Sequence, residues 1–275
     1  MSSPVFTGTI VNGLKLTLNK IPTDKKYGES QAILGKWLSV GKMHDNWEED
    51  LEVGGPGLAS KKDEGAEMAT GGIEEGYRTR YNAATYALKM SISEEAIDDN
   101  KYDKIIQQGQ RLNRAMWKTI DIDATNILVR GHNTAYAGGD GLPLWSASHT
   151  LPHGGTFSNL MATPLSPSRA AVVVATTQIR LMPGHDGITE GYEPKCVVCP
   201  VDQWATWSGL VGSSMDPTSG AFNEINVVNQ DLDLKVVPNK YWTDSTTRWA
   251  IITDADDGIN FRFRKKPVSR DWVNE

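Results

Sequence analysis

The chain is poor in cysteine, in long apolar runs and in excess positive charge, and each shortage argues against a class of protein. It has two cysteines in 275 residues, and the N-terminus lacks the pattern of an export signal, so we expect free thiols in a reducing compartment. No apolar run approaches the roughly 20 residues that span a bilayer, so we expect no membrane partner. The 28 Lys and Arg are outnumbered by 34 Asp and Glu, for a net charge of -6, which argues against sequence-specific nucleic-acid binding.

Motifs that build catalytic or cofactor sites are also missing. The sequence has no Gly-x-Ser-x-Gly elbow, no His-Glu-x-x-His zinc motif and no glycine-rich nucleotide loop. A polar cluster that invites an enzymatic interpretation consists of Asp140, Ser146, Ser148, His149 and His153. The glycines and prolines around it favour polar groups that cap turns in a fixed structural crossing. We therefore expect a protein that is not an enzyme, with no catalytic, cofactor-binding or metal-binding residues.

Two further patterns fall short of a site. Cys196 and Cys199 have the spacing of a redox pair, but they lie in an apolar segment that predicts a buried strand. Residues three apart on a strand face opposite sides, so structural thiols fit better. The segment 254–258 resembles only the start of a calcium-binding loop, because the closing Glu is missing.

The first 76 residues predict extended parts rather than a core. Residues 1–40 lack strong periodicity and are typical of an N-terminal arm, with a short apolar helix or strand near 32–38. Residues 41–76 carry an acidic run punctuated by glycines, and so few apolar residues cannot bury a core of their own. A loop of this length is either functional or disordered, and we expect a protruding, two-stranded excursion.

A regular pattern begins near residue 77. Residues 86–92 alternate between apolar and polar and predict a half-buried strand. Ser91 and Glu94 have the spacing of a capping box, and the apolar residues that follow recur at three- and four-residue steps. They predict one helix of roughly 30 residues, about 45 Å long, with Gly131 as its C′ residue.

The remaining sequence predicts helices set between strands. Ser166 is expected to cap a helix that starts at Pro167 and closes at Gly184. A second helix is expected at 202–210, and strands at 195–201, 226–228, 232–237, 249–253 and 261–264. The order indicates a mixed α and β protein.

Four segments, taken in order, carry a resemblance to a known family. They are 86–102, the block at 140–160, the helix at 167–183 with 194–200 and Trp204, and the stretch 232–254. They resemble the major capsid proteins of tailed bacterial viruses, the HK97-fold group, and most closely the Mu-like major head subunits. The resemblance covers residues 77–264.

The resemblance implies an α+β, HK97-like capsid fold with five parts. These parts are an N-terminal arm (1–40), an extended loop and strand (41–90), a peripheral domain with a long spine helix (91–165), an axial domain (166–252) and a C-terminal return to the peripheral domain (253–275).

The implied function is a shell. Identical subunits would form pentamers and hexamers and close an icosahedral virion head around double-stranded DNA, after assembly in the host cytoplasm. Heterologous contacts that close into rings can tile such a shell. The implied partners are other copies of the chain, packaged DNA held without sequence specificity, and portal, scaffolding and decoration proteins. We expect a scaffolding protein, if there is one, to be a separate chain, and the mature subunit to keep its full length.

An acidic loop can lie over the basic residues of a neighbouring subunit, which suggests a set of intersubunit contacts. The candidates are Glu48, Glu49, Asp50, Lys61, Lys62, Arg78, Arg80, Arg111 and Arg114. The plainer alternative is that these charges are merely solvated. Some family members join a loop lysine to an asparagine of a neighbour, but no motif here places that asparagine, so no crosslink is predicted for Lys61 or Lys62.

Two other functions stay open at this stage. One is a cellular nanocompartment shell of the same fold, similar to encapsulins, which encloses enzymes instead of a genome. The other is a hydrolase that uses Ser146 or Ser148 with His149.

Overall fold

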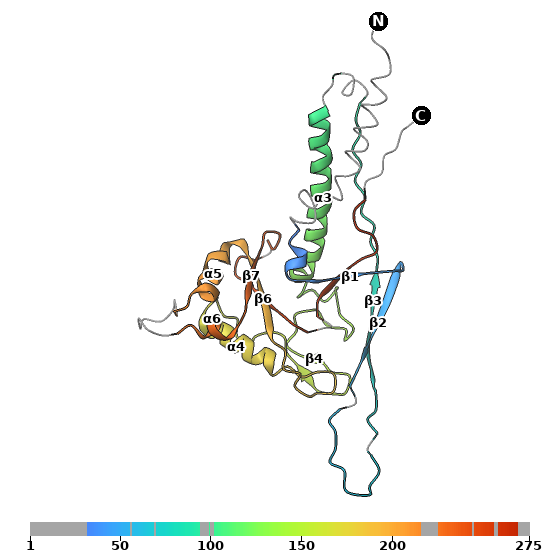
Figure 1. Ribbon diagram of the computed structural model, residues 1–275, viewed down its shortest axis with the longest axis vertical. Helices are drawn as coiled ribbons and strands as arrows, with labels where there is room; N and C mark the ends of the chain where they lie inside the picture. Colours follow the sequence, from blue (N-terminus) through green and yellow to red (C-terminus); the bar gives the residue numbers. More distant parts are fainter. Residues whose placement is uncertain are drawn as a thin grey trace.

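A three-stranded sheet with helices on both faces forms the body of the molecule, and a long helix and a long hairpin project from it (Figure 1). The computed structural model describes residues 32–55, 57–68, 70–93, 99, 102–215, 225–243, 245–255 and 258–268. Most of the arm predicted at 1–40 lies outside these residues, and so does Glu94 of the predicted capping box.

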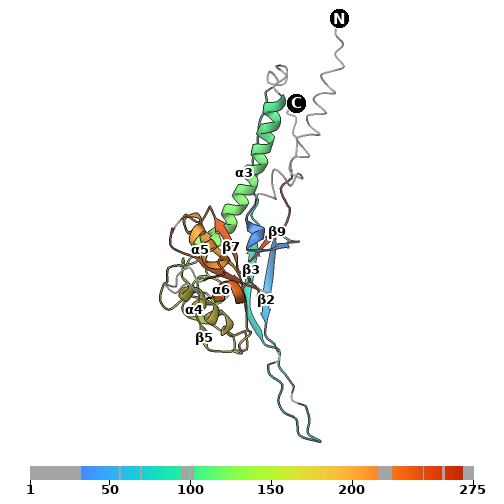
Figure 2. The same cartoon turned by 60° about the vertical axis from the view of Figure 1, so that its left-hand side comes forward.

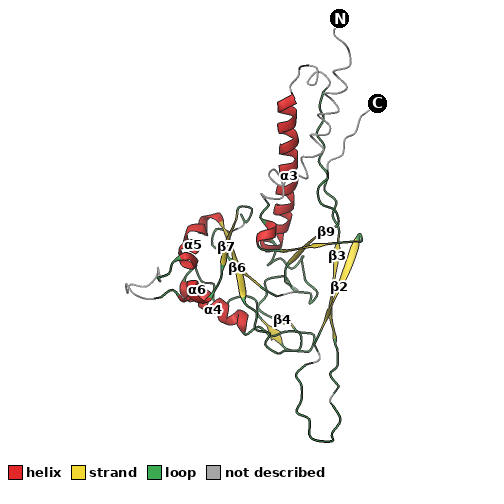
Figure 3. Ribbon diagram, viewed as in Figure 1, coloured by secondary structure: helices red, strands yellow, loops and turns green. Residues whose placement is uncertain are grey.

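Helices and strands are mixed along the chain after residue 100, as the sequence predicts. The helices are η3 (Leu34–Lys36), α3 (Tyr102–Val129), α4 (Arg169–Arg180), η4 (Val201–Gln203), α5 (Trp204–Gly212) and α6 (Val227–Asp231). The strands are β1 (Ser39–Lys42), β2 (Trp47–Val53), β3 (Glu75–Asn82), β4 (His149–Thr150), β5 (Thr156–Phe157), β6 (Pro194–Pro200), β7 (Lys235–Asn239), β8 (Ala250–Thr253) and β9 (Asn260–Phe263). Figure 3 shows their distribution between the body and the projections.

Strand β6 is the centre of the core, because it is buried on both faces. It pairs in parallel with β7 and antiparallel with β8. Cys196 and Val198 pack in one apolar cluster with α3, whereas Val197 and Cys199 pack in a second cluster with α4, α5 and α6. The two thiols are free and face opposite sides, as predicted, and burial raises the pKa of each to about 11. They are therefore structural thiols.

The prediction of one long helix is confirmed by α3, which has 28 residues. Its apolar stripe buries Trp117, Ile120, Ala124 and Leu128 against the sheet. The buried residues of α3 in this cluster lie between Trp117 and Leu128, and the N-terminal half of the helix extends away from the sheet (Figure 2). The helix is thus both a core element and a projection.

The N-terminal and C-terminal parts of the described chain meet beside α3. The short helix predicted near 32–38 is η3, and the backbone N–H groups of Ile33 and Leu34 donate to Asp121 of α3 over 2.9 and 3.1 Å. Strand β1 then pairs in parallel with β9, which confirms the predicted last strand. The two-stranded excursion is also confirmed, since β2 and β3 pair antiparallel.

Two strand predictions are wrong. Residues 86–92 do not form a strand. They run alongside α3 as an extended segment (Figures 1 and 2). Residues 226–228 begin helix α6 instead, with Asn226 as N-cap, accepting a hydrogen bond from the N–H of Val228 over 3.1 Å. A period of two indicates an extended chain but does not supply the neighbouring strand that a sheet needs.

One helix cap is also corrected. The N-cap of α4 is Ser168, not Ser166, and its hydroxyl accepts the N–H of Ala171 over 3.2 Å. Gly131 does follow the end of α3, but it is not in the left-handed conformation that a C′ glycine usually takes. A Cβ atom on Gly131 would lie 2.2 Å from Nε1 of Trp145, so the glycine is needed for the close approach of that indole.

Candidate functional site

The polar block at 140–160 is built around the ring of His149. Its Nδ1 lies 2.5 Å from Oδ2 of Asp140, and its Nε2 lies 3.2 Å from the carbonyl oxygen of Leu144. The ring also stacks on Phe157, with 5.2 Å between the ring centroids. The side chains of His149 and Asp140 are only 12% and 11% exposed. The histidine therefore joins three points of the loop.

The serines of this block do not complete a catalytic arrangement. The hydroxyl oxygen of Ser146 accepts the N–H of Ser148 over 3.3 Å, and the N–H of Ser146 donates to Oδ1 of Asn159 over 3.0 Å. Asn159 in turn donates from Nδ2 to the carbonyl of Leu144 over 2.5 Å. Both nitrogens of His149 are already engaged, so neither is free to take a proton from a serine. The block works as a structural brace.

A second cluster joins strand β2 to strand β9. The guanidinium of Arg262 donates to both carboxylate oxygens of Asp50 and, over 3.2 Å, to Glu48. The backbone N–H of His44 donates to Oε1 of Glu48 over 2.7 Å, and this hydrogen bond, followed by Arg262, lowers the pKa of Glu48. Both carboxylates are thus held within their own chain.

Three further charges of the hairpin and Glu75 form two exposed ion pairs, one across the strands and one within β3. Glu49 is opposite Arg80 in the register, with 3.9 Å between their charged groups. The guanidinium of Arg80 also lies 4.3 Å from the ring centre of Trp47. Arg78 pairs with Glu75 three residues before it, over 3.2 Å. These pairs are exposed and add little stability.

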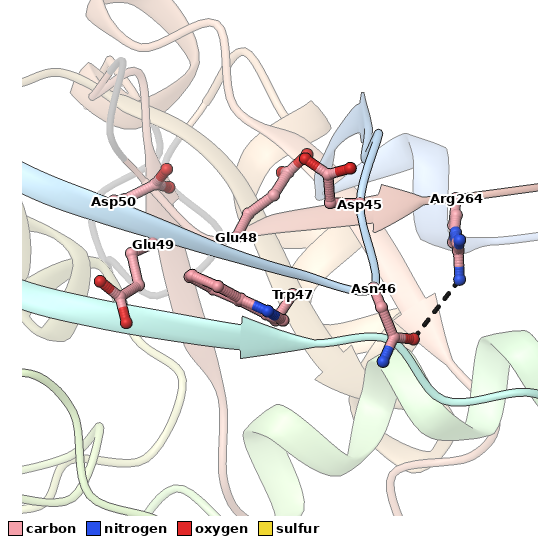
Figure 4. Close-up of a pocket in the computed structure, with 7 residues that line it drawn as sticks. All are labelled: Asp45, Asn46, Trp47, Glu48, Glu49, Asp50 and Arg264. Carbon is pink, nitrogen blue, oxygen red and sulfur yellow. Dashed lines mark hydrogen bonds between the residues drawn. The ribbon is translucent and has the colours of Figure 1, made fainter.

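A shallow hollow beside the start of β2 collects several of these residues (Figure 4). It is lined by Asp45, Asn46, Trp47, Glu48, Glu49, Asp50 and Arg264. Arg264 closes one end by donating to Oδ1 of Asn46 over 3.4 Å.

Within the described ranges, no three His, Cys, Asp or Glu side chains gather closely enough to hold a metal ion. None of the helices in the described part of the chain is long and apolar enough to cross a membrane.

Four predicted contact residues lie away from this cluster. Lys61 and Lys62 are exposed in the segment between β2 and β3, which we call the projecting loop (residues 54–74). Arg111 is exposed and Arg114 half-buried on α3. The projecting loop and α3 extend in opposite directions in both views (Figures 1 and 2). A single chain therefore does not bring the lysines and these arginines together.

The projecting loop exposes apolar side chains that sequence reasoning missed. Leu58, Met68 and Ile73 are 80%, 79% and 72% exposed. They have no periodic spacing and stand among glycines and charges, so the sequence offered no pattern that would mark them. The useful signal is their presence in a segment that cannot bury them itself. Large apolar groups held away from the body are typical of a contact surface.

Comparison with known proteins agrees with a contact role. The sequence model of a family described as phage capsid protein matches residues 76–268. The chain belongs to the phage capsid protein family. Among solved structures, a chain of the procapsid of bacteriophage JBD30 is similar to this capsid protein with a TM-score of 0.58 and 12% sequence identity. The match covers 87% of this chain and 100% of that chain. No curated protein matches the chain.

The family and the shared fold give the capsid protein its general role. It is a structural protein of the phage capsid. Its place is the capsid of the virion. The fold is a mixed helix and strand architecture like that of the procapsid chain.

Proposed function

We propose that this capsid protein has the HK97 fold, as in Mu-like major head subunits, and that its copies form pentamers and hexamers of an icosahedral head around double-stranded DNA. The observation that carries the proposal is the projecting loop. It extends from the body (Figure 1) and exposes Leu58, Met68 and Ile73. Such a loop loses conformational freedom when it is ordered and gains little from its own chain, so a neighbouring subunit is the natural partner.

The proposal includes a division of the chain into five parts. In the proposal, α3 is the spine helix of the peripheral domain (91–165), the hairpin is the extended loop (41–90), and the sheet with α4, α5 and α6 is the axial domain (166–252). The pairing of β9 with β1 supports a C-terminal return (253–275) to the region where the N-terminal arm (1–40) ends.

The proposed intersubunit contacts divide into two groups. Glu48, Glu49, Asp50, Arg78 and Arg80 pair within the hairpin or with β9, so they act in assembly only by sharing these pairs with a neighbour. Lys61 and Lys62 on the loop, and Arg111 and Arg114 on α3, are the proposed direct contacts. A head-to-tail contact between different surfaces of identical chains forms a ring when its rotation closes, and the opposite directions of loop and helix suit such a contact.

The other partners follow from the same role. The packaged DNA would be held by contacts without sequence specificity, and portal, scaffolding and decoration proteins would meet the shell during assembly in the host cytoplasm. The net charge of -6 favours weak rather than tight contact with DNA.

Electron microscopy of the purified chain tests the proposal. We expect closed particles, or free capsomers with fivefold and sixfold symmetry, in negative stain. Light scattering on the same sample would show a mass many times that of the 30.2 kDa chain. A monomer at high concentration, across a range of salt and pH, would contradict the proposed assembly.

A further inference from the structure

The base of the projecting loop is built around the ring of His185. This residue lies in the turn that follows α4, where the N–H of Gly187 donates to the carbonyl of Gly184 over 3.0 Å. A Cβ atom on Gly54 would lie 2.3 Å from Nδ1 of His185, and one on Gly76 would lie 2.8 Å from its Nε2. Gly54 follows β2 and Gly76 lies in β3. One imidazole ring is therefore pressed against the backbone of both sides of the hairpin.

A second histidine contacts the end of the projecting loop. Nδ1 of His153, in the loop between β4 and β5, lies 3.0 Å from Oε2 of Glu74. Glu74 is also the residue whose carbonyl accepts the N–H of Gly54 over 3.0 Å. The hydrogen bond to Glu74, its negative charge and the charge of Asp186 raise the pKa of His153.

We propose that these contacts form a pH-dependent latch in which protonated His153 binds Glu74 and holds the base of the projecting loop against His185. Loss of the proton weakens the ion pair, so the loop can change its direction relative to the body. The two glycines permit this, because no Cβ atom on either strand obstructs movement of the ring.

The charged groups near the base of the loop are carboxylates from three segments, and two of them, Glu74 and Asp186, raise the pKa of His153. Glu52, whose Oε2 accepts the N–H of Tyr77 over 3.3 Å, comes from β2. Glu74 comes from the end of the loop, and Asp186 from the turn that carries His185. The group whose charge the proposal invokes is the imidazole of His153. The ion pair of His153 with Glu74 stabilises the latched position of the loop. Because the pKa of His153 is raised, this stabilisation is complete below the ordinary histidine pKa and is lost as the pH rises through the raised value.

Hydrogen exchange of the full-length chain at pH 6 and pH 8 tests the latch. The exchange rates are corrected for the intrinsic pH dependence of amide exchange. The protein concentration is one at which light scattering gives the same mass at both pH values. The reporters are the amides of Gly54 and Tyr77, whose hydrogen bonds close the base of the loop. We expect their protection to fall by about two- to fivefold at pH 8, the effect of losing one exposed ion pair.

Matched variants separate the latch from a general effect of pH. In His153→Gln, which keeps a polar side chain but does not titrate, we expect equal protection at both pH values. Glu75→Gln is the control. It removes a carboxylate next to Glu74 that pairs with Arg78 instead of His153, so its amide protection should fall between pH 6 and pH 8 as in the native chain. Equal protection of the native chain at both pH values, or a pH response that persists in His153→Gln, would overturn the proposal.

Discussion

The brace at His149 shows how a polar cluster can look catalytic in sequence and be structural in space. The ring bridges Asp140 and the carbonyl of Leu144 and stacks on Phe157. A free carboxylate at Asp140, 11% exposed, would be costly without its partner. Proximity in sequence says nothing about which atoms a ring nitrogen faces, so the cluster in the sequence is weak support for a triad.

We predict that His149→Ala lowers the free energy of unfolding by about 1–3 kcal/mol, because Asp140 and the Leu144 carbonyl lose a hydrogen-bond partner. Chemical denaturation of the purified chain measures the change. His44→Ala is the control, since the exposed His44 takes part in the described contacts through its backbone N–H, and it should change stability by no more than about 0.5 kcal/mol. Equal losses in both variants would mean that the brace contributes nothing.

Asp121 is a buried carboxylate, only 3% exposed, that accepts hydrogen bonds from two backbone N–H groups at the start of η3. Burial raises its pKa, although the two hydrogen bonds from Leu34 and Ile33 act against this. A raised carboxyl pKa means that the folded chain loses stability as the pH rises from the unfolded pKa through the folded one. The hydrogen bonds stabilise the contact, and the charge opposes it.

We therefore predict that Asp121→Asn is at least as stable as the native chain at pH 7. The amide oxygen can accept the same two hydrogen bonds without a buried charge. Asp121→Ala should lose about 1–3 kcal/mol, since Ile33 and Leu34 would keep buried N–H groups without an acceptor. Denaturation curves at pH 7 compare the variants, and an Asn variant less stable than the Ala variant would refute this account.

At the scale of elements, the end of α3 depends on close contact between Gly131 and Trp145. The indole Nε1 donates to the carbonyl of Leu128 over 3.5 Å, in the last turn of the helix. We predict that Gly131→Ala costs about 1–3 kcal/mol, because the new methyl group would overlap the indole. Gly209→Ala in α5 is the matched control. Its Cβ atom would meet open space, so it should stabilise the chain by about 0.5–1 kcal/mol. Thermal denaturation of both variants gives the comparison, and similar shifts in the two would contradict it.

Elements with a regular spacing of apolar residues could be predicted from the sequence. Those that depend on a partner far away in the sequence could not. Helix α3 and strand β6 carry long apolar patterns, and both were found. The segment 86–92 has the period of a strand but runs beside a helix, and 226–228 is too short for a period to decide its type. Arg262 meets Asp50 across 212 positions, and His185 meets two glycines of another element. No local pattern predicts such contacts.

At the scale of the whole molecule, the two apolar clusters are complete within one chain, whereas the projections are not. Both faces of β6 are covered, so the body does not need a neighbour for its core. In the projecting loop, by contrast, three large apolar side chains are at least 72% exposed. A subunit of this kind can fold first and then assemble through its projections.

This separation gives a prediction in which folding and assembly respond differently. In the triple variant Leu58→Ser, Met68→Ser and Ile73→Ser, we expect the subunit to stay folded, because exposed side chains contribute little to the stability of the free chain. Assembly should weaken, since burial of a large apolar side chain at an interface is worth about 1.5–3 kcal/mol. The concentration needed for particles should therefore rise at least about tenfold, as measured by light scattering. The conservative triple Leu58→Ile, Met68→Leu and Ile73→Val keeps the apolar surface and should assemble as the native chain does. If the serine variant forms particles at the native concentration, these side chains do not lie in a subunit contact.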